Sequence, residues 1–148
     1  MIRRTAATAL LALLVTGLGT SCGAGSAVSD YGQIFKGAKG STVNVEVGTG
    51  QRFSLAVGEN QSTGDHWRLL AVPDAKVASF ISKEHKSDGG GPGSGGTSYF
   101  VFNGKQPGRT EIRLQNCWRC PSATPSPTPV DAQSKALSGE AIFSVVVK

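Results

Sequence analysis

The stretch TVNVEVGTGQRFSLAV, residues 42–57, decides the fold class of this 148-residue chain. Apolar residues recur at every second position in both halves: Val43, Val45, Val47, Phe53, Leu55 and Val57. A period of two is the pattern of a β-strand with one buried face. The stretch therefore predicts two consecutive strands, 42–47 and 52–57, joined by a tight connection.

Five further runs downstream are rich in β-branched and aromatic residues, and no helical 3.6-residue pattern of useful length competes with them. We expect strands at His66–Val72, Val77–Lys83, Thr97–Asn103, Arg109–Gln115 and Glu140–Val147. Seven short strands in about 105 residues are typical of an immunoglobulin-like fold. The predicted fold class is all-β, an immunoglobulin-like seven-stranded antiparallel β-sandwich.

The connections between these strands alternate in length. The short ones are 48–51, 73–76 and 104–108, and the long ones are 58–65, 84–96 and 116–139. If each strand runs opposite to the last, alternate connections emerge at one end of the sandwich, so the three long loops should lie together. Extra loop length commonly marks function, although unconstrained loops also lengthen by drift.

The N-terminus has the layout of a secretory signal peptide, residues 1–21. Arg3 and Arg4 precede an apolar run over 6–18, which is shorter than the roughly 20 residues needed to span a bilayer. Residues 19–22 (GTSC) resemble the bacterial lipoprotein box, although Leu18 lies four residues before Cys22 instead of three. We expect export, with Cys22 lipidated on the outer side of the cell membrane; ordinary cleavage and secretion is the alternative.

Composition and charge indicate one small domain. The hydrophobic share of 39% suffices for one modest core. Residues 22–41, rich in Gly, Ala and Ser, are expected to be a flexible tether to a domain at 42–148. Without Arg3 and Arg4, 13 basic residues face 10 acidic ones, a net charge of +3 with no clustered basic stripe. We expect a monomer without a cofactor, metal or nucleic-acid partner.

Each long loop carries a distinctive motif. They are Asn60-Gln61-Ser62-Thr63-Gly64 followed by Trp67, then Gly93-Ser94-Gly95-Gly96, and then Cys117-Trp118-Arg119-Cys120-Pro121. Each motif alone is weak evidence for a function, because glycine runs and polar turns are common. The last motif continues into a Pro-rich insertion, 121–138, which is expected to be extended and solvated.

Together the three motifs resemble the chagasin family, exported inhibitors of papain-like cysteine peptidases with an immunoglobulin-like fold. The family's first motif is Asn-Pro-Thr-Thr-Gly followed by a tryptophan, and four positions match it: Asn60, Thr63, Gly64 and Trp67. Gln61 replaces the proline and Ser62 a threonine. The family's Gly-X-Gly-Gly motif is complete at 93–96. Its Arg-Pro-Trp motif is not present in that order, although Trp118 lies in the corresponding loop.

The resemblance implies a non-covalent inhibitor that fills the peptidase cleft with rigid loops and presents no peptide bond for attack. Thr63 would enter the cleft, the glycines would let backbone approach the enzyme, and Trp118 would anchor the complex. The implied contact residues are Asn60, Gln61, Ser62, Thr63, Gly64, Gly93, Ser94, Gly95, Gly96, Trp118 and Arg119. Purely structural interpretations remain open: the glycine-rich loop can be a linker, and Trp67 is expected to pack in the core.

Cys117 and Cys120 allow three interpretations. A disulfide is favoured in an oxidising compartment and would stiffen the loop around Trp118. A thioredoxin-like redox pair requires its first cysteine at a helix N-terminus, where the thiolate is stabilised, and no helix is predicted there. Zinc binding with His66 and His85 is possible by ligand type, but nothing fixes those histidines nearby.

Three functions therefore compete. The first is a lipid-anchored cysteine peptidase inhibitor. The second is a generic surface protein-binding module on the same scaffold, without peptidase inhibition. The third is a thiol oxidoreductase that uses Cys117 and Cys120. No Ser/His/Asp or paired-carboxylate constellation is visible in the sequence, so we expect the chain not to be an enzyme.

Overall fold

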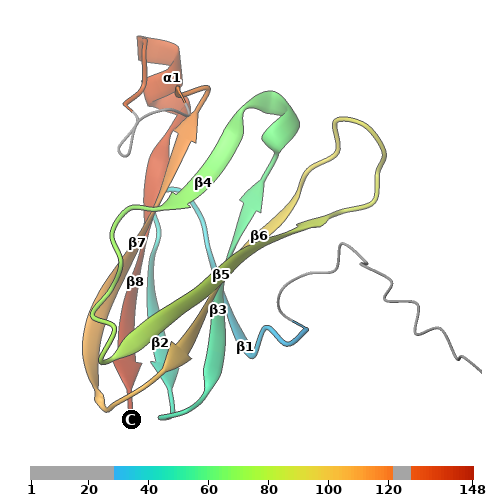
Figure 1. Cartoon of the computed structure of the whole chain (residues 1–148). Coiled ribbons are helices and arrows are strands. Elements are labelled where there is room, and N and C mark those ends of the chain that lie inside the picture. Colours follow the sequence, from blue (N-terminus) through green and yellow to red (C-terminus); the bar gives the residue numbers. More distant parts are fainter. Residues whose placement is uncertain (1–28, 122–127) are drawn as a thin grey trace, which may run out of the picture.

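The computed structural model describes residues 29–121 and 128–148 and shows two four-stranded β-sheets packed face to face (Figure 1). One sheet has the strand order β1-β3-β6-β5 and the other β2-β8-β7-β4. The strands are β1 (Gln33–Gly37), β2 (Thr42–Val47), β3 (Arg52–Glu59), β4 (Asp65–Leu69), β5 (Ala78–Ser87), β6 (Gly96–Gly104), β7 (Gly108–Trp118) and β8 (Gly139–Val147). The predicted all-β sandwich is confirmed.

The core lies between the two sheets and follows the alternation in the sequence. Val45, Phe53 and Leu55 are fully buried, and Phe53 stacks on Phe102 with 5.4 Å between ring centroids. Removing such side chains from water is the main stabilising term for a domain of this size. Trp67 is 3% exposed and belongs to the core cluster, as expected.

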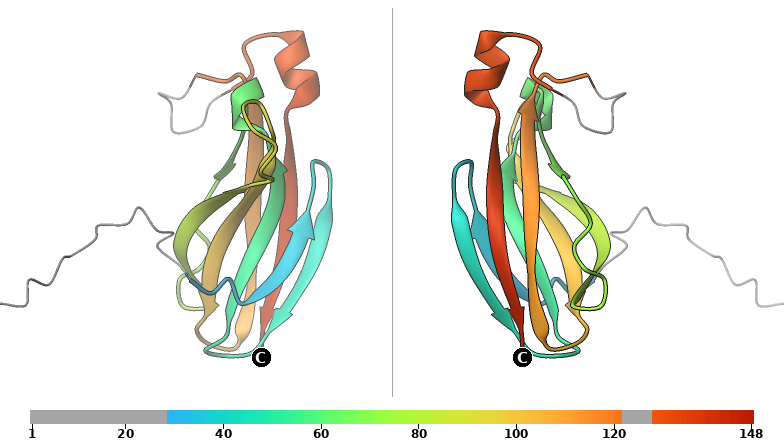
Figure 2. Two further views of the ribbon diagram at one scale, coloured as in Figure 1. Left: turned by 90° about the vertical axis from the view of Figure 1, so that its right-hand side faces the viewer. Right: turned by 90° about the vertical axis from the view of Figure 1, so that its left-hand side faces the viewer.

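The structure adds an eighth strand, β1, inside the segment that we predicted as tether. Its apolar residues explain this, because Phe35 packs against the core and Tyr31, just before the strand, places its ring 4.5 Å from that of Tyr99. β1 pairs in parallel with β3, and β2 in parallel with β8, so the sandwich is not wholly antiparallel. Figure 2 shows β1 and β2 side by side at one edge of the molecule.

The structure differs from the prediction in two further features that affect the loops. β5 extends to Ser87, because its residues continue the antiparallel ladder with β6 after a β-bulge between Phe80 and Ser82. The insertion predicted as extended contains a short helix, α1 (Ala132–Leu137). Asp131 caps this helix, since its carboxylate accepts a 2.6 Å hydrogen bond from the Ser134 N–H.

The predicted signal peptide, Cys22 and the first part of the tether lie outside the described residues. Within 29–121 and 128–148, none of the helices has the length and apolar character needed to cross a bilayer.

Candidate functional site

The three long loops lie together at one end of the sandwich, opposite the C-terminus (Figure 1). Strand register produces this arrangement, because Glu59 pairs with Gly96 and Gly96 with Ser87 in one sheet, while Asp65 pairs with Trp118 in the other. The loops are the β3–β4 loop (60–64), the β5–β6 loop (88–95) and the β7–β8 loop (119–138, of which 122–127 are not described). The predicted grouping of the long loops is therefore confirmed.

Direct hydrogen bonds join the loops to one another. The side-chain amide of Asn60 donates to the Gly93 carbonyl at 3.2 Å, which connects the β3–β4 and β5–β6 loops. The Arg119 N–H donates to the Gly64 carbonyl at 2.8 Å, which connects the β3–β4 and β7–β8 loops. The β3–β4 loop thus stands in the middle, with one neighbour on each side.

The β3–β4 loop forms one 3₁₀ turn, η1 (Gln61–Thr63). The Asn60 carbonyl accepts from the Thr63 N–H at 3.2 Å and from the Thr63 hydroxyl at 2.9 Å. Gly64 has φ 88°, a left-handed conformation that glycine adopts without steric cost. The Asn60 side chain accepts from the Ser62 hydroxyl at 2.6 Å and donates to the Gly93 carbonyl, so it holds both the turn and the neighbouring loop.

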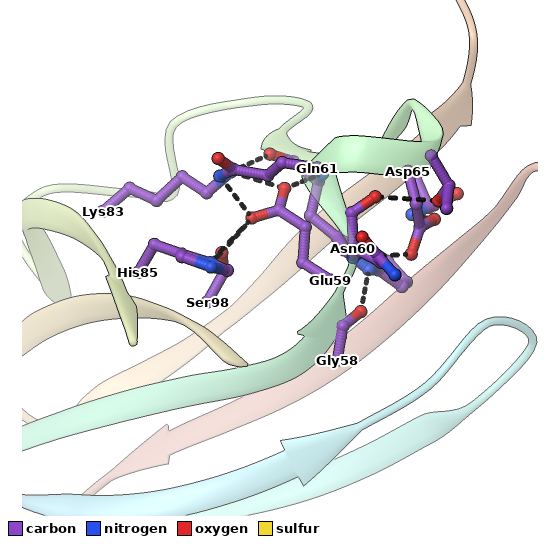
Figure 3. A network of polar contacts seen from close by, with 11 residues as sticks. Gly58, Glu59, Asn60, Gln61, Asp65, Lys83, His85 and Ser98 are labelled. Carbon is purple, nitrogen blue, oxygen red and sulfur yellow. Dashed lines mark hydrogen bonds and ion pairs between the residues drawn. The ribbon is translucent and has the colours of Figure 1, made fainter. Parts of the chain in front are cut away.

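Glu59, the last residue of β3, is the centre of a buried polar network at the base of these loops (Figure 3). Its side chain is 0% exposed. Oε1 accepts from Lys83 Nζ at 2.9 Å and from the Trp67 N–H at 2.6 Å. Oε2 accepts from the Ser98 hydroxyl and from Gln61 Nε2, the latter at 3.1 Å.

The hydrogen bonds keep this buried carboxyl ionised. Burial alone would raise the pKa of Glu59, but the hydrogen bonds from Lys83, Ser98, the Trp67 N–H and Gln61 outweigh it. Together they lower the pKa from 4.5 to about 2. Glu59 therefore carries a negative charge at neutral pH, compensated by Lys83.

Asp65 holds the other end of the β3–β4 loop. Its Oδ2 accepts from the Asn60 N–H at 3.2 Å, so the residues on either side of the turn are bonded to each other. Its Oδ1 accepts from Asn116 Nδ2 at 2.5 Å and lies 3.3 Å from Lys39 Nζ. Both ends of the turn are thus fixed by carboxylates, which limits its freedom before any partner binds.

The three glycines of the 93–96 motif, of which Gly96 is the first residue of β6, are glycine for different structural reasons. A Cβ on Gly96 would lie 2.4 Å from the Lys86 carbonyl oxygen, so this glycine is required by packing. Gly93 has φ 84° and is required by backbone conformation. Gly95 shows neither constraint, since a Cβ there would meet its nearest neighbouring atom at 3.7 Å. Ser94 donates to the Gly91 carbonyl at 2.7 Å within the loop.

Trp118 is the last residue of β7, so our expectation that it lies within the loop is wrong. The side chain is half-buried, and the Arg119 guanidinium lies 4.3 Å from its ring centroid. The Trp118 N–H donates to the Ser138 hydroxyl at 2.9 Å, which fastens the end of α1 to this strand. Arg119 itself is exposed, with φ 51°.

A disulfide joins Cys117 and Cys120, as predicted, and encloses Trp118 and Arg119 in a four-residue ring. Cys117 is buried, and the Cys120 side chain is partly buried. Because both sulfur atoms are in this bond, neither thiolate is available to bind zinc with His66 and His85.

The structure also brings together a serine, a histidine and a glutamate that the sequence did not suggest. His85 Nδ1 lies 3.2 Å from Ser98 Oγ and 3.4 Å from Glu59 Oε2. A hydrolytic triad needs the histidine to contact the serine and the acid through different ring nitrogens. Here one nitrogen faces both, and Ser98 is 0% exposed, so the cluster is structural.

Comparison with models of known protein families identifies the family of this chain. The model for "Chagasin family peptidase inhibitor I42" matches residues 46–126, a range that is more than half of the chain and includes the positions of the three motifs. The chain belongs to the chagasin family. This confirms the resemblance, and it confirms that the chain is an inhibitor-family protein and not an enzyme. A search of curated protein sequences gives no match.

Three solved structures share the chagasin-like fold. The cysteine protease inhibitor EhICP2 from Entamoeba histolytica has a TM-score of 0.53 at 14% identity, covering 78% of this chain and 96% of its own. Amebosin has a TM-score of 0.51 at 20% identity, covering 78% of this chain and 98% of its own. PbICP-C, solved in complex with falcipain-2, has a TM-score of 0.55 at 15% identity, covering 79% of this chain and 100% of its own. At these identities the likeness concerns the fold.

Proposed function

We propose that this chagasin-family chain inhibits papain-like cysteine peptidases by placing its three loops in the active-site cleft without a covalent bond. The observation that carries the proposal is the joining of the loops, by Asn60 to Gly93 and by Arg119 to Gly64, into one continuous surface. Loops that are ordered before binding lose little conformational entropy on binding. One structural neighbour, PbICP-C, was solved in complex with falcipain-2, which supports the same partner class.

The conformation of the β3–β4 loop explains how Thr63 would enter the cleft without being cleaved. Peptidases bind substrates in extended form, whereas residues 61–63 form a 3₁₀ turn. The N–H groups of Thr63 and Gly64 donate to carbonyls of the same loop, at 3.2 and 3.1 Å. The turn is therefore closed on itself, and pulling it open for attack would break these bonds.

The two flanking loops would supply affinity on either side. Gly95 leaves room for close backbone approach, and Trp118 offers a large aromatic face at low conformational cost. Arg119 already orders that face by stacking on the ring. We assign the contact surface to residues 60–64, 93–96 and 118–119.

We further propose that the chain is exported and anchored to the outer side of the cell membrane through lipid on Cys22. The support is the sequence of residues 1–22, and the segment between Cys22 and β1 would act as a short tether. In cells, Cys22→Ser should move the protein from the membrane fraction to the medium. Unchanged fractionation with the membrane would contradict lipid anchoring.

A titration against papain tests the inhibitor proposal. Papain is activated with a thiol and then freed from it, so that the Cys117–Cys120 disulfide stays oxidised during the assay. We expect stoichiometric loss of papain activity at submicromolar protein. Full activity at micromolar protein would reject general inhibition of papain-like enzymes and favour the alternative, a surface protein-binding module. The replaced Arg-Pro-Trp order at Trp118 is the feature that favours that alternative.

A further inference from the structure

Glu59 stands where an apolar residue is expected. It continues the inward-facing series of Phe53, Leu55 and Val57 along β3, and its side chain is 0% exposed. Replacing a buried charged pair by well-packed apolar residues is often neutral or stabilising. A buried carboxylate at this position therefore calls for an explanation other than stability.

The partners of Glu59 come from four different elements at the loop end. Oε1 binds the Trp67 N–H of β4 and Lys83 of β5, and Lys83 Nζ also donates to the Trp67 carbonyl at 2.6 Å. Oε2 binds Gln61 of η1 and Ser98 of β6. Because β4 belongs to one sheet and β5 and β6 to the other, a single carboxylate joins the two sheets beneath the loops.

We propose that Glu59 is a positioning residue of the inhibitory surface: its carboxylate fixes the β3–β4 loop relative to the β5–β6 hairpin and so aligns Thr63 with Gly95. The part of this inference that concerns peptidase binding rests on the proposed function. The part that concerns loop alignment is a property of the free protein.

Gln61 gives the inference a further basis. The chagasin motif has proline at this position, and proline would restrict the turn by fixing its own φ. Here the Gln61 side chain, although exposed, bonds back to the buried Glu59 at 3.1 Å. The hydrogen bond to Glu59 takes over the restriction that the missing proline would have given.

Hydrogen exchange of the full chain tests the alignment. In Glu59→Gln, which keeps the shape and loses the charge opposite Lys83, we expect amides in 60–64 and 91–96 to exchange at least tenfold faster. Val145→Ala serves as the control, because Val145 is 1% exposed, lies in β8 and does not touch this network. At equal loss of melting temperature, the control should not accelerate these loops selectively. Equal acceleration in both variants, or none in Glu59→Gln, would overturn the proposal.

Inhibition kinetics test the functional part. We expect Glu59→Gln to slow association with papain at least tenfold, since fewer molecules present an aligned surface, while Val145→Ala leaves association unchanged at a temperature where both are folded. If the wild type does not inhibit papain, the proposed function fails, yet the exchange result still decides the alignment. Should Glu59→Gln not fold, Gln61→Ala changes an exposed side chain and is expected to accelerate exchange in 60–64; unchanged exchange there would overturn the proposal.

Discussion

At the residue scale, the glycines of the candidate site fall into two groups: those that the fold itself requires and those that it does not. Gly96 is fixed by its packing against Lys86 and His85, and Gly64 and Gly93 by positive φ. Only for Gly95, among these four, does the structure give no internal reason for glycine. Its identity is then best explained by close approach of a partner's backbone.

Gly95→Ala should therefore leave the fold intact and weaken inhibition. A Cβ would meet the Glu59 carbonyl oxygen at an ordinary 3.7 Å, so we expect no loss of melting temperature. We expect at least a tenfold weaker inhibition constant, about 1.4 kcal/mol. Gly58→Ala is the matched control, since its Cβ would enter open space and Gly58 lies in β3, outside the assigned contact residues. If both variants inhibit like the wild type, the β5–β6 loop does not contact papain through Gly95.

Trp118→Ala tests the proposed anchor. The half-buried ring packs under Arg119 and lies outside the main core cluster, so the melting temperature should change little. Inhibition should weaken by about 2 kcal/mol or more, as truncation of an interface tryptophan does. Val72→Ala, at a 72% exposed residue, supplies the control. A large loss of stability with unchanged inhibition would place Trp118 in the core instead.

The low pKa of Glu59 predicts an acid-dependent stability. Because the folded pKa of about 2 lies below the ordinary 4.5, the stabilisation is complete above about pH 4.5 and disappears as the pH falls towards 2. The difference corresponds to at most about 3 to 4 kcal/mol. Urea unfolding across this range should show a steeper fall in unfolding free energy for the wild type than for Glu59→Gln. Parallel curves would show that Glu59 is not specially stabilised as an anion.

At the element scale, prediction from sequence succeeded where burial is one-sided. The alternation in β2 is unambiguous because a strand with one solvent-exposed face must repeat every two residues. β3 shows the same alternation in its sequence, although Ser54 and Ala56 on its other face are also buried. β1 was missed because five residues flanked by glycine and alanine carry too little of this pattern, although Tyr31 and Phe35 do pack. α1 was missed because a six-residue helix depends on its Asp131 cap and on the bond from Trp118 to its C-cap residue Ser138, not on periodicity.

The disulfide ring is an element whose removal should affect function more than stability. In Cys117→Ala with Cys120→Ser, chain entropy predicts a loss of at most about 2 kcal/mol for so short a loop. Arg119, held at φ 51° inside the ring, is then free to relax, which displaces its stack on Trp118. We expect inhibition to weaken about tenfold or more, while the free energy of unfolding falls by no more than about 2 kcal/mol. Unchanged inhibition in the double variant would show that the ring does not order the Trp118 surface.

At the scale of the whole molecule, the grouping of the long loops followed from connection lengths and antiparallel order alone. What the sequence did not reveal is how the loops hold one another, because Glu59, Lys83 and Ser98 are far apart in the chain and meet only in the fold. The sequence offered one signal, the alternation along β3: Glu59 comes two residues after Val57 and so falls at an inward-facing position. A charged residue at an inward position predicts buried partners, and here they lie under the candidate site.

The joined loops, as proposed, occupy the catalytic cleft of a papain-like peptidase without bonding to its thiol. The most direct measurement is calorimetric binding to three forms of papain: free, capped on the active thiol by a small methylthio group, and filled by a covalent peptide-like inhibitor. We expect tight binding to the first, binding within about tenfold to the second, and none to the third. Equal binding to the free and the filled enzyme would contradict occupation of the cleft.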